Sequence, residues 1–499
     1  VLGSPFFSAS ATSFHNASRS AGCACAIVNP ATSAKQVPSN LIIRDPTVTR
    51  RRSGGNIRDY FRRLAKQELR FVLFVWLSGG SLPAHNMKLR CYFMFCLSVF
   101  GLNVGGVELG QGTFRAVQDT AKLGFDPAKL NAIHKLQKKF IADEVCLSNV
   151  ALLASDGKVV YHRAATSKFP GDRPITEKTV FPIWSMSKPI TSVAAMILHE
   201  RGAFKLDDPV STIIPQLAKL RVKAGGGKTE PLKKQITYRD LLRHSSGIAG
   251  YDGSFDQQGT WKEVMELDSL VELIDLLEVK PIEHQPGKKH TYGLSTAVMG
   301  RAIEILSGQP FDKFLEREIF KPLGMEHTRF YLTEQDRGRF QPLFVKLKGK
   351  FRSGTSAEDE LYYAPKSSLF LGGEGLVSTL GDYGRFCQML VDRGKAPNGK
   401  QIILPKTLDL MLSDQLEGIP GYGDAHKGYA FGLGFYFLED TKKERQNSPN
   451  GIFGWGGYHT THFWIDPKNK LYAVFMARLY PYNGKTQTEF RKAVYEALR

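Results

Sequence analysis

The stretch Phe181-Pro-Ile-Trp-Ser-Met-Ser-Lys-Pro-Ile-Thr191 places a serine and a lysine three residues apart, at the start of an expected helix. Residues at positions i and i+3 share one helical face, so the amine of Lys188 can reach the hydroxyl of Ser185. A serine hydroxyl is a weak nucleophile until a neighbouring base takes its proton, and a desolvated lysine can act as that base. The pattern therefore predicts a nucleophile and its activating amine in one short segment.

The residues after Ser185 favour a helix from Pro189 to Glu200, because apolar side chains recur there at helical spacing. Proline is tolerated only in a first turn, which puts Ser185 at the helix N-terminus, where free N–H groups and the positive end of the dipole favour an oxyanion. Ser155 and Lys158 have the same spacing, but an Asp-Gly turn between them predicts a hairpin tip. The alternative for the first pair is a surface serine and lysine beside a core helix.

The positive charge of the chain is concentrated near its amino end. The 499 residues carry a net charge of +19, and residues 1–106 hold 13 Lys and Arg against 3 Asp and Glu. About half of the excess therefore lies in a segment whose composition is unlike that of a folded domain, and no uniform nucleic-acid-binding surface is required. We expect no nucleic-acid partner.

Residues 87–106 have the order of a secretory signal peptide. Met87 and two basic residues precede an apolar run from Cys91 to Leu102, and the small pair Gly105-Gly106 follows. The run is too short for a stable membrane span, so we expect none in the mature protein.

From this pattern we expect translation to start at Met87 and residues 1–86 to be upstream or disordered sequence without a domain. The secreted protein would begin near Val107, and residues 107–499 would form the catalytic domain. The alternative location is mitochondrial, with the Arg-rich part of the first segment acting as a presequence.

The globular part has strand-like segments at both ends and a helical middle. A helix is expected to open at Asp126-Pro127, a hairpin to turn at Asp156-Gly157, and residues 202–330 to be mainly helical. The later expected elements are strands at Phe431 to Phe437, Thr461 to Asp466 and Leu471 to Met476, and a helix from about Thr486 to Leu498. This order predicts one sheet built from both ends of the chain, with a helical subdomain inserted.

Two further segments offer groups for acyl chemistry. Gln285-Pro-Gly-Lys-Lys-His-Thr-Tyr292 precedes a helix expected from Ser295 to Leu306, and a tyrosine beside an amine can be held partly as phenolate and relay a proton. The alternative is a tyrosine that packs beneath the helix. Phe453-Gly-Trp-Gly-Gly457 precedes a strand, where a backbone N–H can donate to a developing oxyanion. The alternative there is an ordinary glycine turn.

Metal and nucleotide motifs are absent from the sequence. No Cys/His pattern has zinc spacing, and His459 and His462 would face opposite sides of a strand. Cys146 and Cys387 are expected to be buried free thiols rather than a bridge. Neither a P-loop nor a G-x-S-x-G elbow occurs. We expect no metal and no cofactor.

Six segments, taken in order, resemble the serine β-lactamase and penicillin-binding-protein superfamily, and most closely the family VIII carboxylesterases, which are similar to class C β-lactamases. They are residues 181–193, 236–248, Gln285-Pro-Gly with Tyr292, 322–328, 373–386 and Gly454-Trp-Gly-Gly457, and the resemblance covers about residues 125–499. It implies an α+β, β-lactamase/transpeptidase-like fold, with an antiparallel sheet flanked by helices, an inserted mainly helical subdomain and a cleft between them.

The resemblance also implies roles for single residues. Ser185 would be the nucleophile, and Lys188 and Tyr292 would share the duties of general base and acid. The oxyanion hole would consist of the backbone N–H groups of Ser185 and Tyr458.

Two departures from the class C pattern bear on the substrate. Leu294 stands where the tyrosine motif of those enzymes ends in asparagine, and Trp455-Gly456-Gly457 stands in place of Lys-Thr-Gly. We expect these residues to contact substrate. Both changes remove groups that grip a β-lactam, and losing a charged contact to a carboxylate typically costs a few kcal/mol. We therefore expect weak β-lactam turnover and a preference for small neutral esters with short acyl chains.

The expected activity is thus that of a serine hydrolase that cleaves small ester substrates through an acyl-enzyme. A transesterase that hands the acyl group to an alcohol or amine would use the same residues. A β-lactamase or D-peptidase is disfavoured by Trp455 and Leu294. The alternative of another class is a catalytically silent scaffold or binding protein of the same fold.

Overall fold

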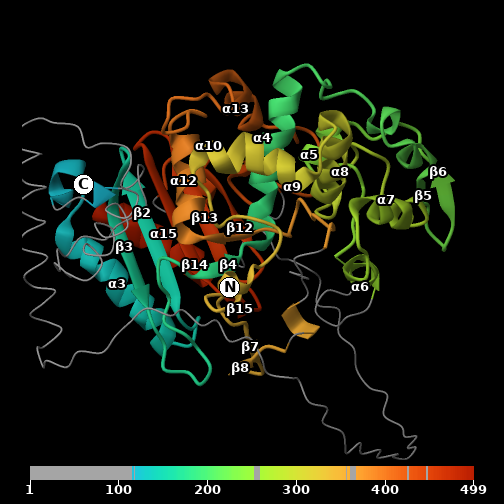
Figure 1. Cartoon of the computed structure of the whole chain (residues 1–499). Coiled ribbons are helices and arrows are strands. Elements are labelled where there is room, and N and C mark those ends of the chain that lie inside the picture. The colour runs from blue at the N-terminus through green and yellow to red at the C-terminus, as the bar shows by residue number, and fades with distance from the viewer. Residues whose placement is uncertain are drawn as a thin grey trace, which may run out of the picture. The chain divides into compact units, whose positions relative to one another are not determined.

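The structure, a computed structural model, describes most of the chain beyond its amino-terminal part (Figure 1). The described residues are 115–116, 119–251, 259–355, 357–359, 367–423, 426–444 and 448–499. The expected targeting segment and the residues before it lie outside them. Within the described part of the chain, no helix is both long enough and apolar enough to cross a membrane.

An eight-stranded sheet forms the centre of the fold, in the order β1-β3-β2-β14-β13-β12-β11-β10. Neighbouring strands are antiparallel except for β1, which runs parallel to β3. The strands are β1 (Arg115–Ala116), β2 (Asn149–Ser155), β3 (Lys158–Ala165), β10 (Tyr429–Phe431), β11 (Tyr436–Leu438), β12 (Phe453–Gly457), β13 (Thr461–Asp466) and β14 (Leu471–Ala477). Because β2 pairs with β14, the sheet joins both ends of the domain, as predicted.

One face of the sheet is covered by the two terminal helices, α3 (Pro127–Ala142) and α15 (Lys485–Ala497). Asp126 caps α3 by accepting from the backbone N–H of Ala128, and Pro127 occupies the first position. From β2, alternate side chains such as Leu153 pack into the same apolar cluster as these helices.

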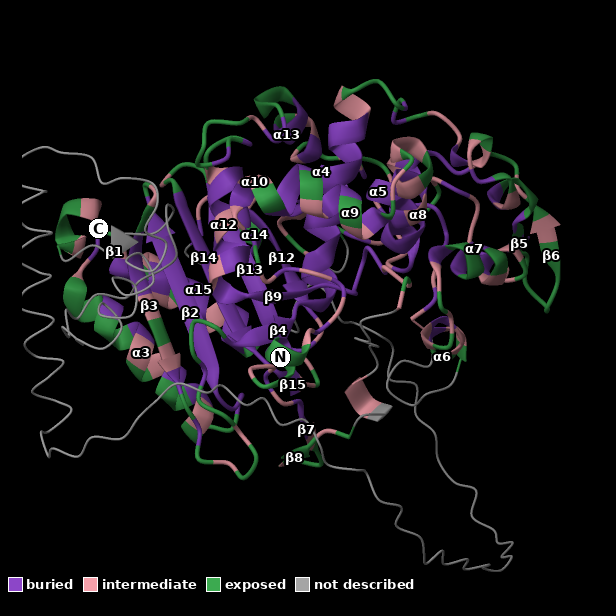
Figure 2. Cartoon of the chain, viewed as in Figure 1, coloured by how far each residue is buried: buried purple, intermediate pink, exposed green. Residues whose placement is uncertain are grey.

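The other face of the sheet is covered by α4 (Ser187–Glu200) and α12 (Leu380–Val391). Val150 and Leu152, the β2 residues that alternate with the first set, pack into this second cluster. Every residue of β2 is therefore buried, and Figure 2 shows the central strands as the most continuously buried part of the fold. A sheet buried on both faces provides a rigid base for α4.

The regular elements within residues 202–330 are mainly helices, as predicted, and further helices follow before β10. They are α5 (Tyr238–Leu242), α6 (Gly259–Met265), α7 (Leu270–Glu278), α8 (Ser295–Ser307), α9 (Phe311–Leu315), α10 (Lys321–Leu323), α11 (Glu334–Arg337), α12 and α13 (Pro405–Met411), and α14 (Thr441–Glu444) follows β11. Two small sheets join distant segments: β4 (Val180–Pro182) with β9 (Val377–Thr379), and β15 (Leu479–Tyr480) with β7 (Phe344–Leu347), which also pairs with β8 (Lys350–Ser353). A third is the local hairpin of β5 (Arg221–Lys223) and β6 (Thr229–Pro231). This is the predicted α+β architecture.

One predicted element is wrong. The apolar run from Phe431 to Phe437 is not a single strand but a hairpin, in which the N–H of Gly432 donates to the carbonyl of Phe435 at 2.9 Å. Gly434 has φ +84°, and a Cβ there would lie 2.0 Å from Ser192 Oγ on α4. The turn needs glycine for both reasons, and the apolar residues around it hid the break.

The two cysteines within the described residues are free and buried, as expected. Cys146 lies near the end of α3, and Cys387 lies in α12. Burial raises the pKa of both thiols, so neither is a reactive thiolate.

Candidate active site

Ser185 lies in a short 3₁₀ turn, Trp184–Met186, that runs directly into α4. The side chain is nearly buried, at 5% exposure of the residue. Pro189 is the third residue of α4, so it falls in the first turn as predicted. The strand pair β4 and β9 holds the segment before this turn, since Ile183 donates its N–H to the carbonyl of Leu376 at 3.0 Å.

Trp184, directly before the serine, has φ +47°. A bulky residue in this left-handed region is a rare and strained conformation that persists only where neighbours enforce it. Here the indole N–H donates to His459 Nδ1 at 2.9 Å, and the ring packs edge-on against Tyr458 with centroids 5.0 Å apart. Contacts with Tyr458 and His459, which follow β12, therefore fix the turn that carries Ser185.

Lys188 is fully buried and points its amine at four oxygen atoms. Its Nζ lies 3.2 Å from Ser185 Oγ, 3.0 Å from Tyr251 OH, 2.9 Å from the carbonyl of Gly373 and 2.8 Å from Glu374 Oε1. The predicted serine–lysine pair therefore exists as a hydrogen bond. The other S-x-x-K segment is the hairpin tip that the sequence predicts, because Ser155 ends β2 and Lys158 begins β3.

The electrostatics at Lys188 differ from the desolvated base that the sequence suggests. Burial does lower the pKa of the amine, but the Glu374 carboxylate and Tyr292 more than offset it, and the pKa of Lys188 is raised. A raised pKa favours the ammonium form of the resting amine at neutral pH. The sequence reasoning missed the carboxylate that causes this.

Tyr292 lies beside the amine, as predicted. Lys188 Nζ is 4.7 Å from the centre of the tyrosine ring, within cation–π range. Its buried hydroxyl has no hydrogen-bond partner among the described residues. The ring lies among those of His244, Tyr251 and Trp455, with centroids 4.9, 5.6 and 6.2 Å away. The fold thus brings Tyr292, from a distant loop, beside the local pair of Ser185 and Lys188.

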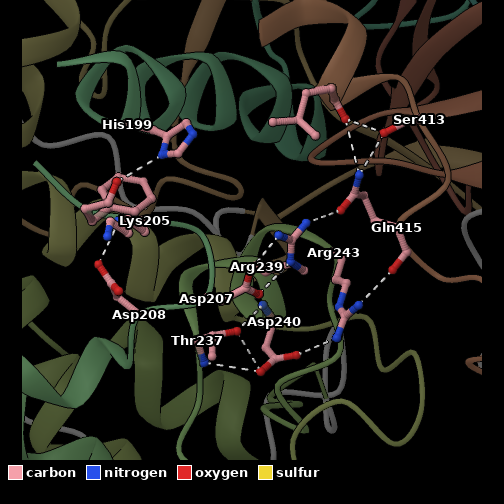
Figure 3. Close-up of polar contacts among 12 residues, drawn as sticks. His199, Lys205, Asp207, Asp208, Thr237, Arg239, Asp240, Arg243, Ser413 and Gln415 are labelled. Carbon is pink, nitrogen blue, oxygen red and sulfur yellow. Dashed lines mark hydrogen bonds and ion pairs between the residues drawn. The ribbon is translucent and has the colours of Figure 1, made fainter. Parts of the chain in front are cut away.

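A polar network joins Thr237, Asp240 and Arg243, at α5 and directly after it, to Gln415 (Figure 3). Asp240, fully buried in α5, accepts hydrogen bonds from Thr237, Arg243 and Ser245, each at 2.8 Å. Burial alone would raise the pKa of Asp240, but these donors outweigh it and lower the pKa, so the group remains a carboxylate. Arg243 also donates to the carbonyl of Gln415 at 2.8 Å, which ties the turn to the segment after α13.

His244 joins this network to the tyrosine. Its carbonyl accepts from the N–H of Thr291 at 2.7 Å, one residue before Tyr292. Burial lowers the pKa of the imidazole well below its usual value, helped by His290 and Lys188, so the ring is neutral. Further along, the N–H of Leu294 donates to the carbonyl of Ala249 at 3.1 Å. The two loops therefore form one unit that holds Tyr251 and Tyr292 side by side.

The expected oxyanion and substrate segment lies at the end of β12, beside the serine turn. A Cβ on Gly457 would lie 2.4 Å from the carbonyl oxygen of Ile183, so only glycine allows this approach. Tyr458 follows directly, with its ring against Trp184. The proximity is compatible with the predicted role of the Tyr458 N–H, which stays a prediction.

The other expected substrate residues are placed as follows. Trp455 is fully buried, with its ring between those of Tyr292 and Phe431. Gly456 pairs with His462 on β13. Leu294 is fully buried under Gly250, where an added Cβ would come within 2.4 Å of it. Leu294 thus supports the backbone that leads to Tyr251, and its contact with substrate stays a prediction.

His459 and His462, which follow β12, pack against aromatic side chains. His459 accepts the indole hydrogen bond from Trp184, and His462 stacks on Phe475 with an interplanar angle of 8°. Burial lowers the pKa of each ring well below its usual value. Both are therefore neutral aromatic packing groups.

Sequence reasoning missed two residues of the site, Tyr251 and Glu374. Glu374 lies within the glycine-rich motif 373–386, and a carboxylate between glycines in an apolar stretch was the available signal. A Cβ on the neighbouring Gly373 would lie 3.0 Å from Lys188 Nζ, so a larger residue there would press on the amine. No pattern in the sequence distinguishes Tyr251 from other loop tyrosines. The carbonyl of Gly373 and the two missed side chains complete the surroundings of the amine.

An α+β fold whose central helix opens on a buried serine–lysine pair with S-x-x-K spacing defines the β-lactamase-like class of proteins. The chain belongs to the Beta-lactamase family, whose model matches residues 134–496.

Two of the relatives with a name are esterases. Esterase EstB from Burkholderia gladioli is 27% identical over 374 residues, covering 70% of this chain and 90% of the relative. Lovastatin esterase from Penicillium rubens is 27% identical over 360 residues, covering 66% and 88%. Among solved structures, EstCE1, described as a hydrolase with promiscuous acyltransferase activity, matches with a TM-score of 0.64 at 24% identity and covers 74% of this chain and 99% of that one. This last likeness shows the fold.

Proposed function

We propose that the chain is a serine hydrolase that cleaves small neutral esters through an acyl-enzyme on Ser185. The observation that carries the proposal is the 3.2 Å contact between Ser185 Oγ and the buried Nζ of Lys188, with the ring of Tyr292 beside the amine. Membership of the Beta-lactamase family and the two esterases among the relatives support it.

In the acylation step Ser185 Oγ attacks the ester carbonyl and gives its proton to the Lys188–Tyr292 pair. The reactive form of the pair is the one that has lost one proton, and with Lys188 as an ammonium group the oxygen of Tyr292 is then the acceptor of the serine proton. When the tetrahedral intermediate collapses, the same proton passes to the leaving alkoxide, which departs as an alcohol. The pair then stands in its starting state beside the acyl-serine.

In the deacylation step water replaces the serine as nucleophile. The pair takes a proton from water, hydroxide adds to the acyl carbonyl, and the proton returns to Ser185 Oγ as the carboxylic acid leaves. In both steps the oxyanion would be held by the backbone N–H groups of Ser185 and Tyr458.

The substrate class follows from the residues near the serine. The strand end that carries Trp455-Gly456-Gly457 provides an indole and glycine backbone and no cation, so it offers no partner for a substrate carboxylate. Aromatic rings crowd the site from Trp184, Tyr251, Tyr292 and Trp455. Such surroundings favour compact, uncharged acyl groups.

A fluorophosphonate probe tests the nucleophile. We expect the purified protein to be labelled and Ser185→Ala to lose both labelling and at least about 1,000-fold of its hydrolysis of a short-chain nitrophenyl ester. Ser155→Ala is the matched control, because Ser155 has the same S-x-x-K spacing at a hairpin tip, and it should keep both. A folded wild type that neither reacts with the probe nor hydrolyses short esters would contradict the proposal and favour a silent scaffold.

Product analysis separates hydrolysis from transfer. With a short-chain ester and a competing alcohol, a hydrolase gives mainly the free acid, whereas a transesterase gives mainly the new ester. A chromogenic cephalosporin measures lactamase activity in the same way, and we expect its turnover to be weak. Efficient turnover would overturn the argument from Trp455 and Leu294.

A further inference from the structure

Glu374 is a buried carboxylate at the centre of the site. Its side chain is 2% exposed, and Oε1 lies 2.8 Å from Lys188 Nζ. The hydroxyl of Tyr251 donates to the same oxygen. Oε2 is buried and has no hydrogen-bond partner among the described residues. A buried carboxylate in such a position is costly unless a cation neutralises it, and here that cation is the lysine beside the nucleophile.

The oxygen atoms around Nζ fit an ammonium group. An ammonium has three N–H donors and no lone pair, whereas a neutral amine has two donors and one lone pair. Two of the four neighbours, the Gly373 carbonyl and the Glu374 carboxylate, can only accept, and Tyr251 directs its own proton to Glu374. Ser185 Oγ also accepts from Nζ, so the four oxygen atoms share the three donors of an ammonium group. With Lys188 in that state, the serine proton must go elsewhere.

We propose that Glu374 is a positioning residue that holds Lys188 as an ammonium group and thereby sets the pH range in which Ser185 is activated. The effect on Ser185 activation rests on the proposed function. The effect of Glu374 on the charge of Lys188 does not, because it is a property of the folded chain.

The groups that face Nζ come from four parts of the fold. Tyr251 follows the turn after α5, Tyr292 precedes α8, His244 ends the α5 turn, and Glu374 precedes β9. Burial and Glu374 raise the pKa of Tyr251 well above its usual value, and the pKa of His244 is lowered, so both are neutral. Among the described residues that face the amine, Glu374 therefore supplies the fixed negative charge.

Replacing the carboxylate by an amide of the same shape has a defined sign. In Glu374→Gln burial is no longer outweighed by the carboxylate, so the pKa of Lys188 falls. Removing a negative charge makes proton loss easier for every group of the pair. The pH profile of kcat/KM should therefore move to lower pH by about one unit or more, whatever happens to kcat.

The matched control is Glu444→Gln, which removes the carboxylate of the other buried ion pair, with Arg491. It should leave the pH profile of the ester reaction unchanged. If Glu374→Gln lowers kcat but keeps the wild-type profile, Glu374 serves only packing and the inference fails.

A second measurement does not depend on turnover. Wild-type Lys188 has a folded pKa raised above its unfolded value, so its contribution to stability is present at neutral pH and is lost only as pH rises through the folded pKa. In Glu374→Gln the folded pKa lies below the unfolded value of about 10.5, so the unfolded state binds more protons and stability rises with pH between the two values. The melting temperature of the variant, relative to wild type, should therefore rise by several degrees between about pH 7 and pH 9.5.

Adding Lys188→Met to Glu374→Gln should abolish that pH dependence, because the titrating group is gone. A flat difference in melting temperature between Glu374→Gln and wild type would overturn the inference even if the ester reaction is established. The expected slope in a protein that hydrolyses no ester would support the electrostatic pairing while the proposed function fails. The two failures are therefore distinguishable.

Discussion

Among the described residues, two ion pairs have both partners fully buried, and the two pairs differ in chemistry. At the site, Lys188 pairs with Glu374 at 2.8 Å, with side-chain exposures of 1% and 2%. Arg491, a residue of α15, pairs with Glu444 at 2.9 Å, and each side chain is 3% exposed. The two pairs are matched in burial, in distance and in a neighbouring tyrosine hydroxyl. They differ in the cation and in what else lies beside it.

Arg491 is a cation that keeps its charge. Its guanidinium donates to Tyr429 OH at 2.5 Å and lies over the ring of Trp464, 5.5 Å from the centroid. Burial opposes the charge, but Tyr429, Tyr436 and Glu444 outweigh it and raise the pKa of Arg491. A guanidinium does not release its proton in a protein, so this pair can only stabilise the fold. A lysine with a serine at 3.2 Å can take part in proton transfer. The cation that partners the carboxylate, rather than burial, separates the pair that we propose to be catalytic from the structural one.

Breaking the structural pair should have the largest effect on stability. Arg491→Met leaves Glu444 buried without its cation, and we expect a loss of about 3–5 kcal/mol in the free energy of unfolding. Urea denaturation measures it. The fraction that remains folded should hydrolyse esters at the wild-type rate. A loss of turnover in fully folded variant would show that the two pairs are coupled.

Breaking the catalytic pair should act on the rate. We expect Lys188→Met to lower kcat/KM by at least about 100-fold, which corresponds to about 2.7 kcal/mol in the barrier. Because the variant also leaves a buried carboxylate alone, the double variant Lys188→Met/Glu374→Gln is the control for folding. A double variant that is stable and still slow assigns the loss to chemistry, whereas recovery of the wild-type rate would remove lysine from the mechanism.

The difference between the two pairs also shows what the sequence could predict. Ser185, Lys188 and Tyr292 are recognisable because their chemistry is tied to local patterns: a three-residue spacing, a proline in a first turn and a loop before a helix. The sheet was predictable because β14 is an apolar run, β2 is apolar between its two end residues, and β13 has three successive apolar residues, Phe463 to Ile465. These are short-range signals, and the structure confirms the elements they predict.

The rest depends on contacts between distant segments. Glu374 is 186 residues from Lys188 in the chain, and no local pattern reports that its carboxylate reaches the amine. The sequence therefore suggested a desolvated base, whereas the structure places a carboxylate 2.8 Å from the amine, which favours its ammonium form. The hairpin of β10 and β11 was hidden for the same reason, since the need for Gly434 arises from its approach to Ser192 on α4.

Removing the phenol should have the next largest effect on rate. We expect Tyr292→Phe to lower kcat/KM by about 10- to 100-fold, because the pair loses its proton acceptor while Lys188 keeps its partners. The free energy of unfolding should change little, since the hydroxyl makes no hydrogen bond to the described residues. Steady-state kinetics and urea denaturation of the same preparation test both statements. An unchanged rate would leave acceptance of the serine proton to the Lys188–Glu374 pair.

Tyr251→Phe should have the smallest effect, although Tyr251 touches both members of the pair. Its hydroxyl donates to Glu374 and accepts from Lys188 at 3.0 Å. Losing the donor leaves more negative charge on the carboxylate and favours the ammonium, whereas losing the acceptor disfavours it. The two effects oppose each other, so we expect the pH profile of kcat/KM to move by less than about half a unit. A shift as large as that of Glu374→Gln would mean that Tyr251, and not the carboxylate, sets the protonation state of the lysine.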